Sequence, residues 1–173
     1  GSSARDNELL NKGRVPVYKT LRGGRYTYHG PGQRIIYIML NLNRFEKDIR
    51  LFIKKLEEIL IRSFSHFNLD VYPHRERIGL WVNNEGEEEK IGAIGLKIKK
   101  WISLHGIAIN IDPDLSYFDG IIPCGLPNHN VTSIRKMTGK VTMDQFDREL
   151  IKNFSSKIGI MKRLQYIDLY GVK

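Results

Sequence analysis

The sequence is poor in cysteine, in long hydrophobic runs and in clustered positive charge. Its one cysteine, Cys124, cannot form an internal disulfide, which favours a reducing compartment, and we expect a cytoplasmic protein. The clearest apolar run covers residues 35–40, far below the roughly 18 residues that a membrane helix needs. The start of the chain lacks the basic, apolar and small-residue regions of a signal peptide. These absences argue against a membrane protein and against a secreted one.

Metal and nucleotide motifs are also missing. The five histidines show no His-x-x-x-His spacing, and a single cysteine cannot build a structural zinc site. The glycines fit neither GxxxxGK[ST] nor GxGxxG after a strand, so a phosphate cradle for a nucleotide is unsupported. We expect no metal and no cofactor.

The composition is that of an ordinary globular protein with an excess of positive charge. The 173 residues, 41% of them hydrophobic and 27% charged, suit one well-cored domain over residues 1–173. A formal net charge of +9 attracts nucleic acid, an anionic membrane or an acidic protein. Because no run of five basic residues occurs, a nucleic-acid-binding tail is disfavoured. Charge alone leaves an acidic protein partner as an equal candidate.

Hydrophobic periodicity predicts one α+β domain with a mixed or antiparallel sheet and packed helices. We expect strands at 35–42, 69–72, 78–82, 90–98 and 101–111, an acidic turn at 83–89, and a loop over 112–130. A long amphipathic helix is expected from Phe45 to Phe64, with Asn43 and Glu46 as its capping box. A short helix is expected at 131–137, and Thr142 with Gln145 predicts the start of a last one.

Two residues are candidates for chemistry. Cys124 lies between Pro123 and Gly125, where it is either a small buried hydrophobe or a presented nucleophile that needs a nearby base or cation. Lys90 ends an acidic run and opens an apolar one. It is either an exposed lysine paired with those glutamates or a partly desolvated base at the mouth of a groove.

Glycines gather where a ligand or another chain would approach the backbone. The stretch 22–33, RGGRYTYHGPGQ, stands directly before an apolar run, and Gly92, Gly95 and Gly106 fall within expected strands. Glycine inside a strand is costly unless something must approach closely. The pattern suggests a bound chain-like ligand. His29 and His105 are more simply explained by packing or hydrogen bonding.

These motifs, in this order, resemble one family. The matching stretches are RGGRYTYHGPGQ at 22–33, KIGAIGLKIKKWISLHGIAINIDPDL at 90–115, FDGIIPCGL at 118–126 and VTS at 131–133. They resemble the octanoyltransferases of lipoate synthesis, the lipoyl(octanoyl) transferases of the lipoate-protein ligase B family, from about Ala4 to Phe154. The resemblance implies a fold like the catalytic domain of biotin and lipoate protein ligases. Family members begin with a further strand–helix–strand segment that this sequence lacks before Gly1, and the tail at 164–173 lies outside the likeness.

The resemblance implies an acyltransferase in the first step of endogenous lipoate synthesis. It would take an octanoyl group from acyl carrier protein and deliver it to a lysine of lipoyl domains, in 2-oxoacid dehydrogenases and the glycine cleavage H protein. Cys124 matches the family's thioester nucleophile and Lys90 its partner lysine. We expect Lys90 to take the thiol proton and later the proton of the incoming lysine, without ATP.

The resemblance also implies a set of substrate-binding residues. They are Arg22, Gly23, Gly24, Arg25, Tyr26, Thr27, Tyr28, His29, Ala93, Ile94, Gly95, Gly106, Ile107 and Ala108, with His105 in support. Small residues on adjoining strands would leave a slot for an eight-carbon chain, at about 0.8 kcal/mol per buried CH₂. The positive charge would steer acidic carrier proteins and lipoyl domains, with no role for nucleic acid or membrane.

Two other functions compete with octanoyl transfer. An ATP-dependent lipoate or biotin ligase of the same fold would adenylate its acid and would need no cysteine. Lipoate ligases carry an aspartate after the histidine, where this sequence has Gly30-Pro31-Gly32. A basic nucleic-acid-binding module would bind with a steep salt dependence and would catalyse no acylation.

Overall fold

The computed structural model describes residues 1–11, 13–45, 47–74, 76–125 and 129–158, with the main chain only at Cys124. The strands are β1 (Gln33–Tyr37), β2 (Val71–Pro73), β3 (Leu80–Asn84), β4 (Glu87–Ile94), β5 (Lys97–Lys99), β6 (Ile102–Leu104) and β7 (Gly106–Asn110). The α-helices are α1 (Ile49–Ser65), α2 (Ile134–Thr138) and α3 (Met143–Ile158). Short 3-10 helices are η1 (Asp6–Glu8), η2 (Leu42–Arg44), η3 (Leu115–Gly120) and η4 (Pro123–Gly125).

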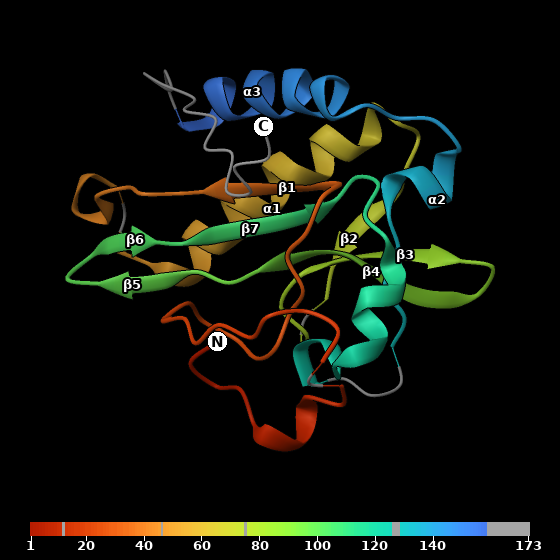
Figure 1. Ribbon diagram of the computed structural model, residues 1–173. Coiled ribbons are helices and arrows are strands. Elements are labelled where there is room, and N and C mark those ends of the chain that lie inside the picture. The colour runs from red at the N-terminus through yellow and green to blue at the C-terminus, as the bar shows by residue number, and fades with distance from the viewer. Residues whose placement is uncertain (12, 46, 75, 126–128, 159–173) are drawn as a thin grey trace, which may run out of the picture.

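A five-stranded sheet in the order β1-β7-β4-β3-β2 forms the centre of the fold. Each neighbouring pair is antiparallel, and Ala108 of β7 lies opposite both Ile35 of β1 and Ala93 of β4. β5 and β6 form a separate hairpin. Figure 1 shows α1 and α3 on one side of the sheet, and the N-terminal segment with η3 and η4 on the other. The predicted α+β class is confirmed.

The hydrophobic core lies between the sheet and the two long helices. The α1 side chains Leu56, Ile59 and Leu60 are fully buried. Phe64 of α1 meets Phe146 of α3 at a ring-centroid distance of 5.4 Å. The predicted apolar faces of both helices therefore pack against each other. None of the helices in the described ranges has the length and hydrophobicity needed to cross a bilayer.

Helix caps were predicted with mixed success. The box at the start of α3 is confirmed, because Thr142 N donates to Gln145 Oε1 at 2.8 Å and Gln145 N to Thr142 Oγ1 at 3.3 Å. The predicted start of the long helix near Asn43 is wrong, since α1 begins at Ile49. The side chain of Asp48 accepts from Arg50 N and Leu51 N in the first turn of α1, and its negative charge suits the positive end of the helix.

Strand boundaries differ from the predictions where residues adopt positive φ. Lys100 and Trp101 have φ of 50° and 62° and form the tip of the β5–β6 hairpin, near the predicted turn. His105, with φ of 62°, separates β6 from β7, so the strand expected at 101–111 becomes two. The strand expected at 90–98 is also divided, between Ile94 of β4 and Lys97 of β5, without a positive φ. The expected strand at 35–42 ends at Tyr37, and the expected loop at 112–130 contains η3 and η4. The turn expected at 83–89 consists only of Glu85 and Gly86, because the residues before and after them belong to β3 and β4.

Candidate active site

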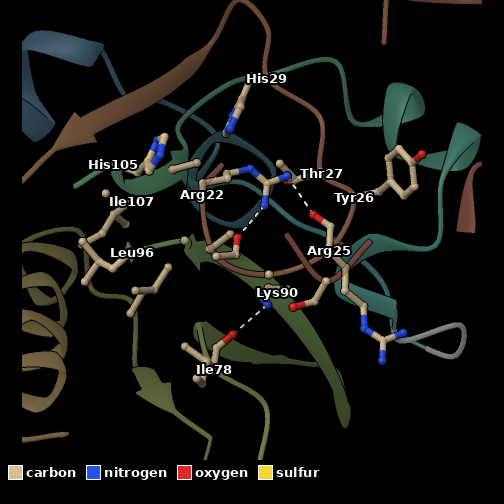
Figure 2. A pocket seen from close by; sticks show the side chains of 18 of the residues that line it. Arg22, Arg25, Tyr26, Thr27, His29, Ile78, Lys90, Leu96, His105 and Ile107 are labelled. Carbon is tan, nitrogen blue, oxygen red and sulfur yellow. Dashed lines mark hydrogen bonds between the residues drawn. The ribbon is translucent and has the colours of Figure 1, made fainter. Parts of the chain in front are cut away.

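A cavity of about 510 Å³ lies where the glycine-rich loop, β4, β7 and the segment before β3 come together (Figure 2). It is lined by the sequence-predicted residues 22–27, His29, 93–95 and 106–108, together with Lys90 and His105. The predicted residues are far apart in sequence and meet in one place. Antiparallel pairing of β4 with β7 sets 93–94 opposite 107–108, which explains why two separate motifs line the same wall.

Lys90 lies in β4, and its residue surface is only 5% exposed. Its Nζ donates a hydrogen bond of 2.9 Å to the carbonyl oxygen of Ile78 and lies 5.1 Å from the ring centroid of Trp81. An exposed lysine paired with the neighbouring glutamates is therefore the wrong interpretation. Glu88 pairs with Arg77, and Glu89 pairs with Lys136 at 3.0 Å. The Ile78 carbonyl and the Trp81 ring thus take the place of the water that the Lys90 side chain loses on burial.

Gly79 makes room for the Lys90 side chain. Its φ is +141°, and a Cβ there would lie 2.5 Å from Cε and 2.8 Å from Nζ of Lys90. Any other residue at position 79 would displace the lysine or strain the main chain. The sequence analysis did not single out Gly79, because its requirement arises from a side chain on another strand.

The main chain around Cys124 forms η4, whereas its side chain lies outside the described residues. Pro123 lines a small cavity of about 20 Å³ together with Lys90, and Gly125 lines the main cavity with Lys90. Main-chain hydrogen bonds hold the segment on both sides. Ile122 N donates to Glu8 O at 2.8 Å, and Lys90 exchanges bonds of 2.9 Å with Asn130 O and Thr132 N. The loop of the predicted nucleophile is thus anchored on the strand of the predicted base.

The glycine-rich loop is closed by its own arginine. Nη1 of Arg22 donates to Gly23 O at 2.9 Å, and Nη2 donates to Arg25 O at 2.7 Å. Arg25 in turn forms an ion pair with Glu8, whose residue surface is 3% exposed, and its guanidinium packs against Gly125. Glu8 therefore connects the glycine-rich loop with the Cys124 loop. The sequence reasoning missed it, since one acidic residue in a polar, unpatterned N-terminal segment carries no signal of burial.

Some glycines serve the protein's own packing instead of opening space for a ligand. A Cβ at Gly23 would lie 2.5 Å from the carbonyl oxygen of Leu96, and a Cβ at Gly106 would overlap the carbonyl oxygen of Ile36. At these two positions the approaching chain predicted from the sequence is the neighbouring backbone. At Gly95 the nearest atom would be Cδ of Arg22 at 3.4 Å, an ordinary contact.

The predicted substrate-binding residues His29 and Tyr28 and the predicted supporting residue His105 have different environments. Nδ1 of His29 lies 3.3 Å from Oε1 of Gln33. Burial lowers the pKa of His29, the contact with Gln33 opposes this, and the positive charge of Arg22 adds to it. His105 borders the cavity near Ile107 and Leu96 (Figure 2). Tyr28 instead stacks on Tyr117, with ring centroids 4.8 Å apart, and is outside the cavity lining.

A cluster around Arg77 was not predicted. Arg77 forms an ion pair with Glu88, its guanidinium carbon lies 4.4 Å from the ring centroid of Trp81, and its Nη1 lies 2.8 Å from Nε2 of His129. Burial and then the charge of Arg77 lower the pKa of His129. Arg77 and Ile78 both border the cavity. Among the described residues, no group of three His, Cys, Asp or Glu side chains is placed to hold a metal ion.

Solved structures with the same fold include lipoate and biotin protein ligases. A bipartite lipoate protein ligase from Thermoplasma acidophilum matches with a TM-score of 0.66 and 19% identity, over 85% of this chain and 59% of that one. A biotin protein ligase from Aquifex aeolicus matches with a TM-score of 0.55 and 17% identity, over 73% of this chain and 53% of that one. This chain therefore spans between half and three fifths of those two structures. At such identities the likeness establishes the fold alone.

Sequence relatives are much closer. An octanoyltransferase of Wolbachia sp. subsp. Brugia malayi is 52% identical over 155 residues, covering 89% of this chain and 75% of that protein. One from Rhodospirillum rubrum is 46% identical over 160 residues, covering 92% and 74%. The family model of the lipoyl protein ligase A/B catalytic domain matches residues 2–155. The resemblance seen in the separated motifs is confirmed, and the chain belongs to the lipoyl protein ligase A/B catalytic domain family.

Proposed function

We propose that this protein is an octanoyltransferase of lipoate synthesis that carries the octanoyl group as a thioester on Cys124. The relatives at 52% and 46% identity are named octanoyltransferases. The observation that carries the assignment to a site is the buried Lys90. Its ammonium borders an acyl-sized cavity, and its main chain is hydrogen-bonded to the segment that follows Cys124.

The cavity has an apolar part suited to an acyl chain. Ile35, Ile53, Ile94, Leu96 and Ile107 contribute to its lining, whereas Lys90, Arg22 and Arg25 supply polar groups. An octanoyl chain buried against the apolar side chains would gain about 0.8 kcal/mol for each CH₂, and several kcal/mol in all. Its carbonyl carbon would then lie toward Lys90 and η4, where the nucleophile is expected.

The chemistry proceeds in two balanced steps. Lys90 in its neutral form takes the thiol proton of Cys124, and the thiolate attacks the octanoyl thioester of acyl carrier protein. The carrier leaves as a thiolate and takes the proton from Lys90, so one thioester replaces another, Lys90 is neutral again and no ATP is needed. In the second step Lys90 accepts a proton from the lysine ammonium of a lipoyl domain. The neutral amine attacks, an amide forms, and Cys124 leaves as a thiolate that takes up the second proton of the amine and becomes a thiol again.

The excess of positive charge supports protein substrates of opposite charge. The formal net charge is +9, and Arg22, Arg25 and Arg77 all border the cavity. Acidic carrier proteins and lipoyl domains would be attracted at low ionic strength and would dock with the reacting group near the cavity. We therefore propose octanoyl-acyl carrier protein as donor, and lipoyl domains of 2-oxoacid dehydrogenases and the glycine cleavage H protein as acceptors, in the cytoplasm.

A ligase function is the alternative, because solved structures of this fold include a lipoate-protein ligase bound with ATP. That likeness rests on 21% identity, whereas the octanoyltransferase relatives stand at 44–52%. The two functions differ in what they require. A ligase would octanoylate a lipoyl domain from free octanoate and ATP, and a Cys124→Ala variant would keep that activity.

The test is the intact mass of the protein after mixing with octanoyl-loaded acyl carrier protein. We expect one octanoyl adduct on the wild type, removed by hydroxylamine, and none on Cys124→Ala. Addition of a lipoyl domain should then move the adduct to its lysine without ATP. A folded wild-type protein that gains no adduct, or an equal adduct on Cys124→Ala, would overturn the thioester mechanism.

A further inference from the structure

The carbonyl that holds Lys90 comes from a short connection between β2 and β3. Ile78 supplies this carbonyl although the residue is 57% exposed, and Gly79 follows it with positive φ. Pairing between β2 and β3 begins only at Leu80, opposite Pro73. The strand pairing therefore leaves the position of the Ile78 carbonyl to the side chains that contact this connection.

One of these side chains is Arg77, which makes three different contacts with its surroundings. Its guanidinium forms an ion pair with Glu88, lies over the Trp81 ring, and reaches His129. Only 13% of the Arg77 side chain is exposed, against 35% of the Glu88 side chain, so the arginine is the shielded partner of this pair. Nε1 of Trp81 also donates to the Arg77 carbonyl at 3.0 Å, which holds the main chain of the same residue.

These contacts close a circuit that begins and ends on one strand. Glu88 and Lys90 are both in β4, two residues apart, so they lie on the same face. The circuit runs from Glu88 to Arg77, along the main chain to the Ile78 carbonyl, and back to Nζ of Lys90. A lysine side chain is long and flexible, and an acceptor fixed relative to its own strand restricts where its nitrogen lies.

We propose that Arg77 is a positioning residue, whose ion pair with Glu88 fixes the Ile78 carbonyl and thereby orients Lys90 for proton transfer in the cavity. This inference rests on the proposed function, in which Lys90 is the base. Loss of the Arg77 side chain leaves the Trp81 bond to its carbonyl and the strand pairing of β3 with β4 in place. The protein should therefore fold, with Lys90 less well placed.

The experiment measures how fast octanoyl-N-acetylcysteamine, a small thioester that avoids protein docking, acylates Cys124. We expect Arg77→Met to slow acylation roughly tenfold to a hundredfold, as a misplaced catalytic group does. Arg77→Lys and Glu88→Gln should fall between, because each keeps part of the contact. Arg135→Met is the matched control, since it removes the same charge from an exposed pair with Asp112 at 3.9 Å and should leave the rate unchanged.

A double-mutant cycle separates positioning from a general loss of structure. If Arg77 acts through Lys90, Arg77→Met should not slow acylation further in a protein that also carries Lys90→Met. In a protein that keeps Lys90, Arg77→Met should shift the pH–rate profile of acylation. An Arg77→Met variant with the wild-type rate and profile would overturn the proposal. So would an equal loss in both backgrounds. If Arg77→Met fails to fold, Glu88→Gln supplies the same cycle.

A second measurement separates failure of this proposal from failure of the proposed function. Reductive methylation of Lys90, followed by peptide mass mapping, reports how firmly its amine is held. We expect faster methylation at Lys90 in Arg77→Met and no change in Arg135→Met. Faster methylation in a protein whose Cys124 is never acylated would retain the positioning role and refute the transferase. Unchanged methylation would refute the positioning role whatever the activity.

Discussion

The ammonium of Lys90 and the main-chain carbonyl of Ile78 are 2.9 Å apart, and this contact shows how the candidate site is built. Lys90 lies within β4, and Ile78 lies just before β3, the strand hydrogen-bonded to it. A buried cation is thus held by a backbone acceptor next to its own sheet, which keeps its nitrogen at the cavity. The proposed chemistry at Cys124 depends on this placement.

Replacing Gly79 should damage both stability and acylation. A Cβ at Gly79 would lie 2.5 Å from Cε of Lys90, and the φ of +141° disfavours any side chain. We expect Gly79→Ala to cost about 1–3 kcal/mol of unfolding free energy and to slow Cys124 acylation well below the wild-type rate. Urea unfolding and intact-mass kinetics measure the two effects.

Gly86→Ala is the matched control for Gly79. It also has positive φ, at +94°, but a Cβ there would have no neighbour within 4 Å among the described residues. It should lose stability from backbone strain and keep its acylation rate. Equal acylation by the two variants would contradict a specific role of Gly79 beside Lys90.

Acidification should destabilise the folded protein through two histidines whose pKa values the fold lowers. Burial lowers the pKa of His29 and of His129 from the ordinary value of about 6.5. Between the lowered pKa and about 6.5 the unfolded chain binds more protons than the folded one, so stability rises with pH in this window. The melting temperature should fall as pH drops below about 6.5, and less steeply in His29→Gln. A His29→Gln protein with the wild-type pH dependence would refute the contribution of His29.

Ile53 should help to set the acyl chain length. It is the α1 residue that borders the cavity, where it meets a lining that includes Leu96 and Ile107. Ile53→Phe fills part of this apolar space, and we expect the preference to move from octanoyl toward hexanoyl thioesters. Each lost CH₂ contact is worth about fourfold in kcat/KM, from about 0.8 kcal/mol. Competition between thioesters of different length, read by intact mass, gives the ratio, and Lys54→Ala on the exposed face of α1 should leave it unchanged.

The ion pair between Arg34 and Asp147 should stabilise the fold without acting in catalysis. Nε and Nη2 of Arg34 in β1 donate to the Asp147 carboxylate of α3 at 2.7 and 2.6 Å, and Asp147 is 6% exposed. We expect Asp147→Asn to cost about 1.5–3 kcal/mol, as for buried hydrogen bonds to charged groups. Glu58→Gln breaks the exposed pair with Lys157 at 3.6 Å and should cost about 0–1 kcal/mol. Equal losses in urea unfolding would contradict the stronger role of the buried pair.

Features that depend on local sequence were predicted well. The capping box of Thr142 and Gln145, and the apolar spacing in α1 and α3, involve residues within one or two turns of each other. Local geometry alone determines such contacts. The start of α1 was misplaced at Asn43, which lies inside η2, and only the packed structure shows that Asp48 caps the helix.

The family, the α+β class and the candidate reactive residues follow from the sequence alone, because glycine-rich motifs, hydrophobic periodicity and residue types are properties of the chain before it folds. The tertiary structure decided that Lys90 is buried, that Glu88 pairs with Arg77, and that Glu8 connects two loops around Cys124. Burial and ion pairing depend on which segments, distant in the sequence, lie side by side in the fold, and strand register determines which of their residues are neighbours. A lysine beside three glutamates looks exposed in the sequence, and only the packing of β3 against β4 gives it a carbonyl partner and removes its water.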